Sequence, residues 1–350
     1  MNRIIRILIV DDSAYVRKVV REMLSNSPML EVVGAARDGK EALELVQTLN
    51  PDVITSDLMM PELDGLGFVR EQMSRRPIPI VMMSSVDENN ADTLAALDAG
   101  AVDFVQKPTA LATEKMFEVR QKLIEKIKTA AEVHLENLQF IPTKISQTVK
   151  KSSTYSFNQN IRYDVMVLGI STGGPQALRF LIPQLPADFP IPVAIVLHMP
   201  VGYTKMYAEK LNEISALEVL EAQEGDELIA GRVLLAPAGK HLTFKRNKNG
   251  QTAAHLSLTP LELQHRPAVD VLFQSAAETF RDRTLGIVMT GMGKDGQNGA
   301  AWIKAQGGTI FTEAEETCVV FGMPGAVIEA GLSDKVIGLD KMAQVLLEIV

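Results

Sequence analysis

Short apolar runs alternate with longer amphipathic stretches from the start of the chain. Each run is rich in valine, isoleucine and leucine, and apolar residues in the stretches between them recur every three or four positions. Such runs predict strands buried on both faces, and the stretches between them predict the crossover helices of a parallel sheet. The first predicted strands are residues 6–10, 31–35, 53–56, 80–83 and 103–105. The fold class is therefore α/β, with five strand–helix units that end near Lys128.

A second series of the same kind begins at Tyr163. The buried strand DVMVLGI runs directly into STGGP and a helix that opens with Pro175, and proline is favoured in the first turn of a helix. Further parallel strands are predicted at residues 193–197, 232–235 and 285–289. Residues 241–246 and 252–258 flank asparagine and glycine residues typical of a tight turn, which predicts a β-hairpin. This half is expected to be a doubly wound, parallel-sheet α/β domain.

Between the two series the apolar periodicity fades, and Ser, Thr, Asn, Gln and Lys accumulate. This composition is typical of a linker. Its lysines indicate a solvated face rather than a nucleic-acid-binding arm, because few aromatic residues lie among them. The chain is therefore predicted to consist of a first domain at residues 1–125, a linker at 126–160 and a second domain at 161–350.

Length, charge and cysteine content narrow the class of protein. The 350 residues suffice for roughly two domains with separate cores. The 35 Lys and Arg against 43 Asp and Glu give a net charge of −8, which disfavours a nucleic-acid-binding protein. The single cysteine, Cys318, excludes an internal disulfide, and the start MNRIIRILIVDD is typical neither of a secretion signal nor of a spanning helix. We therefore expect a cytoplasmic protein without membrane insertion.

Acidic side chains follow two of the predicted strands of the first domain. Asp11 and Asp12 come after the first strand and Asp57 after the third. The carboxyl ends of parallel strands share one edge of a sheet, so these carboxylates should converge. Like charges so close are tolerated beside a hard divalent cation, and Mg²⁺ prefers carboxylates. Ser84 and Lys107 follow the next strands and would complete an oxyanion site, although each acid alone is equally typical of a helix N-cap.

A glycine-rich turn, GISTGGP, follows the first strand of the second domain. It fits the pattern G-x-S-x-G, in which glycines allow a sharp strand-to-helix turn that presents a serine hydroxyl, here Ser171, above the sheet. Taken alone, the segment is equally typical of a phosphate-binding turn or of a turn with no further role. The G-x-G-x-x-G spacing of a dinucleotide site is absent from it.

Two further polar side chains are expected at the same edge as Ser171. The strand PVAIVLHMP runs into His198, and the strand LGIVMTGMGKDG leads through a glycine-rich turn to Asp295. Acyl transfer needs this set: the hydroxyl attacks, the imidazole takes and returns the proton, and the carboxylate orients the imidazole. Backbone N–H groups near Met292 and in the Ser171 turn are candidates for an oxyanion hole. The chain order Ser, His, Asp differs from that of the common hydrolase families, so the assignment depends on geometry.

Three other histidines do not follow predicted strands directly. His241 and His255 belong to the predicted hairpin, and we interpret them as surface or packing residues. His265 precedes RPAVDVLF and is placed where it can line the cleft.

The first domain resembles the receiver domain of two-component response regulators over residues 1–125. IVDDS, SDLMMPELDGL, MMSS and FVQKP occur in the order and spacing of that family. The resemblance implies a flavodoxin-like (βα)5 fold in which Asp57 accepts a phosphoryl group from a histidine kinase. The implied Mg²⁺ ligands are Asp11, Asp12, Asp57 and the backbone carbonyl of Met59. The implied phosphoryl contacts are Ser84, in place of the commoner threonine, and Lys107, and the implied switch aromatic is Phe104.

The second domain resembles the methylesterase domain of the bacterial chemotaxis CheB family. The motifs GISTGGP, LHMP, LLAPAGKHL, HRPAVDVLF, TGMGKDG and CVVFGMPGAV follow in family order. The resemblance implies hydrolysis of glutamyl methyl esters on chemoreceptors and deamidation of receptor glutamines, without a cofactor in the hydrolytic site. The implied triad is Ser171, His198 and Asp295, with Thr172 beside the nucleophile and Met292 in the oxyanion site. It also implies that the receiver covers the active site until Asp57 is phosphorylated.

Three other classes of protein share some of these sequence features. A DNA-binding response regulator needs a helix-turn-helix and a basic output face, and the long α/β second half and the charge of −8 argue against it. A non-catalytic scaffold or phosphate sink is disfavoured by the presence of Ser171, His198 and Asp295 together. A hydrolase of the same build that acts on another ester or amide differs only in its substrate, which these motifs do not specify.

Overall fold

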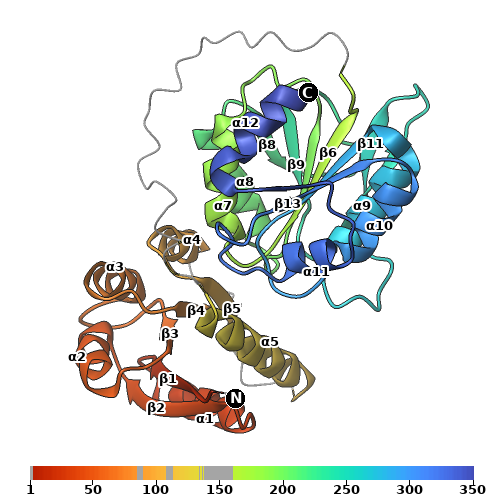
Figure 1. Cartoon of the computed structure of the whole chain (residues 1–350). Coiled ribbons are helices and arrows are strands. Elements are labelled where there is room, and N and C mark those ends of the chain that lie inside the picture. Colours follow the sequence, from red (N-terminus) through yellow and green to blue (C-terminus); the bar gives the residue numbers. More distant parts are fainter. Residues whose placement is uncertain (1–2, 85–89, 108–112, 134, 136, 138–160) are drawn as a thin grey trace. The chain divides into compact units, whose positions relative to one another are not determined.

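A computed structural model describes residues 3–84, 90–107, 113–133, 135, 137 and 161–350 (Figure 1). The chain divides into two compact units, Met1–Gln139 and Phe140–Val350, and each has a parallel sheet of its own. The prediction of a two-domain α/β chain is therefore confirmed. Most of the predicted linker at 126–160 lies outside the described residues.

The first unit is a five-stranded parallel sheet with the strand order β2-β1-β3-β4-β5. Its strands are β1 (Ile5–Val10), β2 (Leu30–Ala36), β3 (Val53–Asp57), β4 (Ile80–Ser84) and β5 (Asp103–Gln106). Its helices are α1 (Ala14–Ser25), α2 (Gly39–Leu49), α3 (Gly65–Arg75), α4 (Asn90–Asp98) and α5 (Thr113–Ala131). Helices α1 and α5 contact each other, whereas α2, α3 and α4 contact one another in series, so the helices form two layers. This is the predicted (βα)5 arrangement.

Helix α5 continues beyond residue 125, where the sequence predicts the first domain to end. Its last turns are residues 126–131. They pack on the first unit, because Ile127 and Ala130 are fully buried. The polar composition that indicates a linker begins only near Thr129. An apolar stripe on one helix face therefore extends the ordered part of the first unit further than overall composition indicates.

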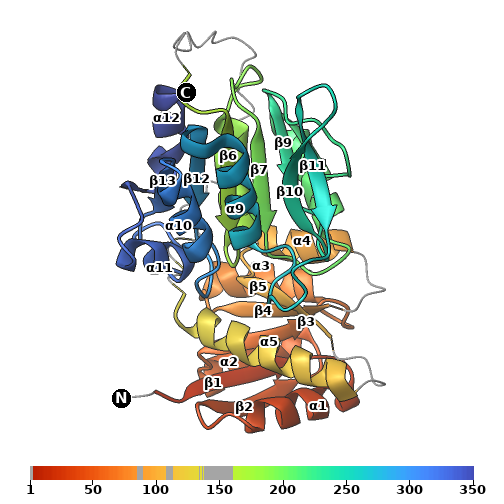
Figure 2. The same ribbon diagram turned by 90° about the vertical axis from the view of Figure 1, so that its right-hand side faces the viewer.

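The second unit is a seven-stranded parallel sheet with the strand order β14-β13-β12-β6-β7-β9-β8 (Figure 2). Its strands are β6 (Val165–Ile170), β7 (Val193–Leu197), β8 (Glu218–Glu221), β9 (Arg232–Leu235), β12 (Thr284–Val288), β13 (Thr309–Glu313) and β14 (Lys335–Ile337). The chain runs from β6 outward through β7 to β8 and β9, and then returns to add β12, β13 and β14 on the other side of β6. The sheet is therefore doubly wound, with its topological switch point between β6 and β12.

Two groups of helices cover this sheet. One group is α7 (Gly174–Leu181), α8 (Thr204–Ile214) and α12 (Leu339–Ile349), and the other is α9 (Val269–Phe280), α10 (Gln297–Ala305) and α11 (Met323–Glu329). A separate antiparallel hairpin, β10 (His241–Arg246) and β11 (Thr252–Ser257), packs against α9. Each strand named from the sequence is present, and its ends differ from the prediction by at most one residue. No helix in the described part of the chain is long and apolar enough to cross a membrane.

The core of the second unit lies where α9 packs between the sheet and the hairpin. Phe273 of α9 is fully buried there, together with Leu272 and Ala276 of the same helix and Phe244 of the hairpin. Burial of this apolar face holds α9 in place, and the first turn of α9 begins at the carboxyl edge of the sheet.

We expect Phe273→Ala to lower the free energy of unfolding of the second unit by about 3–5 kcal/mol, because it removes a buried ring and leaves a cavity. The measurement is guanidinium denaturation followed by circular dichroism. The matched control is Trp302→Ala, since this aromatic side chain is 44% exposed and should contribute little. Equal losses for the two variants would contradict the placement of the core.

Candidate functional sites

The carboxyl edge of the first sheet brings three acidic side chains together. Asp11 and Asp12 follow β1, and Asp57 ends the neighbouring strand β3. One carboxylate oxygen from each lies within 4.8 Å of the others. Asp11 and Asp57 are buried, whereas Asp12 is exposed. The three carboxylates thus converge as the positions of the strands predict.

Helix capping does not explain these acids. The N-cap of α1 is Ser13, whose hydroxyl accepts the Val16 N–H, and the N-cap of α3 is Asp64, whose carboxylate accepts the Gly67 N–H. Asp11 accepts the backbone N–H of Ser13 at 2.9 Å with one oxygen. Its other oxygen, Oδ2, is buried and accepts no backbone N–H group.

Lys107 is the cation of this cluster. Its ammonium nitrogen lies 2.6 Å from Asp57 Oδ2 and 3.3 Å from Asp11 Oδ2. Burial raises the pKa of Asp11 above its ordinary value, and the charge of Lys107 opposes this only in part. One ammonium group therefore pairs with two carboxyl groups, Asp11 and Asp57, while the Asp12 carboxylate lies close by, so negative charge remains in excess. A donor set of this kind fits a hard divalent cation.

The remaining predicted residues of the first unit lie around this cluster. The Ser84 side chain is fully buried, accepts a hydrogen bond from the Thr93 hydroxyl at 3.2 Å, and its backbone carbonyl accepts the Lys107 N–H. Met59 comes two residues after Asp57 and its side chain is exposed. The Phe104 ring is buried on β5, with the Lys126 ammonium 6.0 Å from its centroid.

In the second unit, Ser171 and His198 leave the sheet side by side. They directly follow Ile170 and Leu197, which are paired across β6 and β7, and the His198 N–H donates to the Ile170 carbonyl at 3.1 Å. Strand β12 pairs with β6 on its other side and leads into the loop that carries Asp295. The structure therefore brings the three residues to the edge of three adjacent strands, as the sequence predicts.

His198 and Asp295 are directly bonded. Nε2 of His198 lies 2.9 Å from Oδ2 of Asp295, and both side chains are largely buried. Since an ionised carboxylate only accepts hydrogen bonds, Nε2 carries the hydrogen of this contact, and in the neutral tautomer with this arrangement Nδ1 is the nitrogen with the lone pair. Nδ1 is buried and has no hydrogen-bond partner. The ring is thus oriented with its basic nitrogen unoccupied.

Asp295 is held by the beginning of helix α9. Its two oxygens accept the backbone N–H groups of Val269, at 2.7 Å, and Asp270, at 2.9 Å. Burial acts to raise the pKa of Asp295, but the hydrogen bond from His198 and the two backbone donors outweigh it, so the pKa lies below its ordinary value. The carboxylate therefore stays ionised beside the imidazole.

Asp270 makes the reciprocal contact, and sequence reasoning missed it. Its carboxylate accepts the N–H groups of Gly296 at 2.8 Å and Gly299 at 2.7 Å, at the beginning of α10. Burial raises the pKa of Asp270, although these hydrogen bonds oppose the rise. The available signal was an acidic residue within HRPAVDVLF, but its partners lie farther along the chain, at the beginning of α10. The two helix beginnings thus cap each other across the site.

The turn that carries Ser171 is pressed against the segment after β12. The Ser171 N–H donates to the Thr290 carbonyl, and the Thr290 hydroxyl donates to the Thr172 carbonyl, both at 3.0 Å. A Cβ atom added at Gly291 would lie 2.8 Å from the Cβ of Ser171, so only glycine fits there. Met292 directly follows Gly291, and Thr172 is buried within the turn that carries Ser171.

The other histidines differ in environment. His265 stacks on His198, with ring centroids 4.1 Å apart, and so lines the site. His241 is fully buried: its Nδ1 accepts the Ala268 N–H and its Nε2 donates to the Pro260 carbonyl, while burial lowers its pKa. His255 lies between Glu224 and Lys245 at the surface. His241 therefore packs the core beneath the loop that carries His265.

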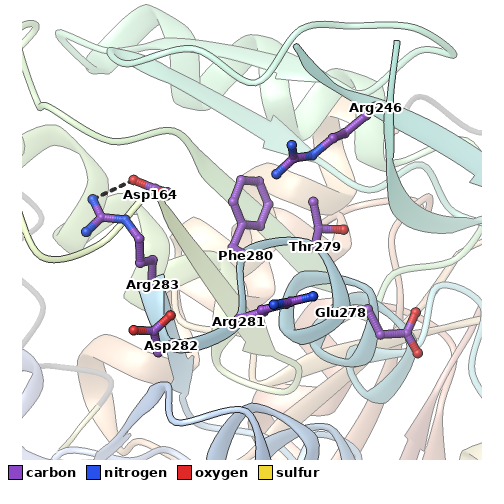
Figure 3. Close-up of a pocket in the computed structure, with 8 residues that line it drawn as sticks. All are labelled: Asp164, Arg246, Glu278, Thr279, Phe280, Arg281, Asp282 and Arg283. Atoms are coloured by element: carbon purple, nitrogen blue, oxygen red, sulfur yellow. Dashed lines mark hydrogen bonds and ion pairs between the residues drawn. The ribbon is translucent and has the colours of Figure 1, made fainter. Parts of the chain in front are cut away.

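A pocket of about 630 Å³ opens at the opposite edge of the second sheet (Figure 3). It is lined by Asp164, Arg246, Glu278, Thr279, Phe280, Arg281, Asp282 and Arg283. Asp164 precedes β6 and Arg283 precedes β12, whereas Ser171 and Asp295 follow these strands. The Asp164–Arg283 ion pair, at 2.7 Å, connects the two strand beginnings. This pocket is therefore separate from the residues with candidate chemistry.

The two folds and their polar sheet edges define the class of protein: a response regulator whose output unit is an α/β enzyme. The receiver domain of response regulators matches residues 7–117, and CheB methylesterase matches residues 166–346. The chain belongs to the CheB methylesterase family.

Relatives of this family cover the whole chain. A "Protein-glutamate methylesterase/protein-glutamine glutaminase 5" of Myxococcus xanthus is 48% identical over 98% of this chain and 97% of its own length. A protein-glutamate methylesterase/protein-glutamine glutaminase of Thermotoga maritima is 41% identical over 100% of this chain and 99% of its own. The crystal structure of the Thermotoga maritima CheB methylesterase catalytic domain is also similar to this chain. The match covers 54% of this chain and 99% of the crystallised domain, with 44% identity and a TM-score of 0.52.

Glu313, at the end of β13, is a second carboxyl group near the site that the sequence analysis missed. It is fully buried, and burial raises its pKa from 4.5 to about 7 although Thr290 and Thr317 donate hydrogen bonds to it. Because the pKa is higher in the folded protein than in the unfolded chain, the neutral carboxyl stabilises the fold below about pH 4.5. This contribution is lost as the pH rises through about 7.

We expect the free energy of unfolding of the wild type to fall, relative to that of Glu313→Gln, by roughly 3 kcal/mol between about pH 5 and pH 8. The glutamine keeps the shape and an acceptor but does not titrate. Urea denaturation of both proteins at a series of pH values measures the difference. Parallel pH dependences in the two proteins would contradict the buried, titrating carboxyl.

Proposed function

We propose that this chain hydrolyses methyl esters of glutamate side chains on chemoreceptors, deamidates receptor glutamines, and is activated by phosphorylation of Asp57. The relatives that cover the chain carry both enzymatic activities in their names. The observation that carries the proposal is the state of His198. Its Nε2 is fixed by Asp295, and its Nδ1 is buried and unpartnered at the strand end next to Ser171.

The proposed reaction is acyl transfer through Ser171. The hydroxyl oxygen attacks the side-chain carbonyl carbon, and its proton passes to Nδ1 of His198. The imidazolium then returns the proton to the leaving group, which departs as methanol from an ester or as ammonia from an amide. Water attacks the acyl group in a second, equivalent cycle and releases the glutamate. Asp295 stabilises the imidazolium in each cycle because it stays ionised.

Backbone N–H groups supply the proposed oxyanion hole. We assign this role to the N–H of Met292 and to the turn that begins at Thr172. The close approach of Gly291 to Ser171 supports the assignment, because it places both segments beside the nucleophile. One such donor is typically worth a factor of about 10² to 10³ in rate.

The first unit is the proposed switch. A carboxylate oxygen of Asp57 attacks the phosphorus of a phosphohistidine in the kinase, and the bond from phosphorus to the histidine nitrogen breaks. Asp11, Asp12, Asp57 and the backbone carbonyl of Met59 are the proposed ligands of Mg²⁺, which neutralises charge on the phosphoryl oxygens when bound. The convergence of the three carboxylates, with one oxygen from each within 4.8 Å of the others, supports this ligand set.

Lys107 and Ser84 are the proposed sensors of the phosphoryl group, and Phe104 is the proposed switch aromatic. The Lys107 ammonium already contacts Asp57 Oδ2 at 2.6 Å, so new charge on that side chain acts on it directly. A phosphoryl group adds a charge of about −1.5 to −2 at this buried point. Since the Lys107 N–H is bonded to the Ser84 carbonyl, the ends of β4 and β5 respond together.

The proposal places the protein in the cytoplasm, with chemoreceptors as substrate and a chemotaxis histidine kinase as phosphodonor, and with no nucleic-acid partner. Its role there is adaptation, because removal of methyl groups resets receptor output. A scaffold without activity and a hydrolase for another ester are the remaining alternatives. The first fails if methanol is released, and the second fails if glutamyl methyl esters are the substrate that is hydrolysed.

We expect Ser171→Ala to reduce methanol release from methyl-labelled chemoreceptor membranes by about 10³-fold or more, because the nucleophile is lost. The assay counts labelled methanol released by the purified full-length protein. Ser257→Ala, which removes a hydroxyl from the hairpin, is the control and should behave as the wild type. Activity near that of the wild type in a folded Ser171→Ala protein would overturn the triad.

We expect methanol release by the wild type to rise when Mg²⁺ and a small phosphodonor such as acetyl phosphate are added together. The rise should disappear in Asp57→Asn, which keeps the shape of the side chain but lacks the nucleophilic oxygen, and should persist in the surface variant Asp98→Asn. Phosphorylation itself is measured by labelling with the donor's phosphoryl group. A rise that persists in Asp57→Asn would contradict the proposed switch.

A further inference from the structure

Thr290 makes two hydrogen bonds to the turn that carries Ser171, and the proposed reaction gives Thr290 no role. It is buried two residues after the end of β12. Its carbonyl accepts the Ser171 N–H at 3.0 Å, and its hydroxyl donates to the Thr172 carbonyl at 3.0 Å. The hydroxyl oxygen also accepts the Val320 N–H at 3.0 Å. One residue thus holds Ser171 on one side and Thr172 on the other.

Thr290 is itself anchored by Glu313. The Thr290 N–H donates to Oε2 of this carboxyl group at 2.9 Å, and the Thr317 hydroxyl donates to Oε1 at 3.0 Å. Glu313 is completely buried, and no cation pairs with it in the part of the chain that the structure describes. Ionisation of a carboxyl group that is buried without a cation costs free energy, so stability at and above neutral pH does not account for Glu313.

We infer that Thr290 is a positioning residue for Ser171, and that Glu313 is the anchor that keeps Thr290 in place. The inference rests on the proposed function, because it assigns the contacts to the nucleophile of that reaction. Thr290 touches no substrate atom. It acts through the two residues of the turn whose backbone it binds.

The packing around the turn explains why a hydrogen-bonded clamp is needed. Gly173 has a positive φ of 80°, and a Cβ atom there would lie 2.5 Å from the Cβ of Val319 and 3.2 Å from Oγ1 of Thr290. The turn is therefore a closely packed strand-to-helix bend with no room for a side chain at Gly173. The hydrogen bonds at Ser171 and Thr172 connect its backbone to Thr290. A displacement of about 1 Å at a reacting atom can cost about 10² in rate.

The test compares Thr290→Val, which has the shape of threonine but no hydroxyl, with Thr290→Ser, which retains the hydroxyl, in the full-length protein. We expect kcat for methyl-ester hydrolysis to fall about 10- to 100-fold in Thr290→Val, with KM changed less than about twofold. Thr290→Ser should recover most of the loss. The matched control is Thr309→Val, which removes another buried hydroxyl of the same sheet, bonded to Tyr163, and should leave kcat unchanged.

A second readout follows Ser171 directly. A fluorophosphonate that labels activated serines should modify Ser171 at a rate that falls in Thr290→Val in parallel with kcat. Glu313→Leu, which removes the acceptor for the Thr290 N–H, should slow labelling, and Glu313→Gln should recover it. These two variants test the inference even if Thr290→Val does not fold.

The inference is overturned if kcat of Thr290→Val equals that of Thr309→Val, or if serine at position 290 fails to restore activity. It is also overturned if the wild type is not labelled at Ser171, since there is then no activated nucleophile to position. A wild type that is labelled but releases no methanol from receptors contradicts the proposed substrate alone. The labelling rates of the variants at positions 290 and 313 then still decide the roles of Thr290 and Glu313.

Discussion

The second unit depends on an exchange of caps between two helices. Asp295, before α10, accepts backbone N–H groups at the beginning of α9, and Asp270, at the beginning of α9, accepts those at the beginning of α10. Each carboxylate satisfies donors that a helix leaves unpaired, and each lies at the positive end of a helix dipole. Because Asp295 also binds His198, the same exchange fixes the imidazole. The geometry of the His198–Asp295 pair is thus a by-product of how two helices begin.

Both units place their polar side chains at the carboxyl edge of a parallel sheet, but they balance the charge differently. In the first unit Asp11, Asp12 and Asp57 converge, and one ammonium group pairs with two of them, so the edge retains negative charge that suits a cation. In the second unit the charge of Asp295 is stabilised by main-chain donors and an imidazole, which leaves the edge ready for acid–base chemistry. The same topological rule therefore places an acidic cluster that suits a metal ion in one unit and a Ser, His and Asp set that suits acid–base chemistry in the other.

The sequence predicts the features that arise from local patterns. Buried Val and Ile runs identify most strands, and the residues directly after them, such as Ser171 and His198, are found where expected. Strands β8, β13 and β14 were not predicted individually, because their sequences EVLE, TIFTE and KVI are short or rich in polar residues. The roles of Thr290, Glu313 and Asp270 were also missed, since their partners are backbone groups far along the chain. The free nitrogen of His198 likewise depends on a side-chain orientation that no spacing determines.

The exchange of caps has a consequence for how such a sequence can vary. The N–H groups that hold Asp295 belong to the main chain at Val269 and Asp270, and every residue except proline supplies such a group. Substitution at Val269 therefore leaves its hydrogen bond available. Inserting or deleting one residue before α9 is different, because it moves each donor by about 1.5 Å along the helix and about 100° around it. The two hydrogen bonds to Asp295 therefore depend on the length of the chain before α9 more than on the side chains at Val269 and Asp270.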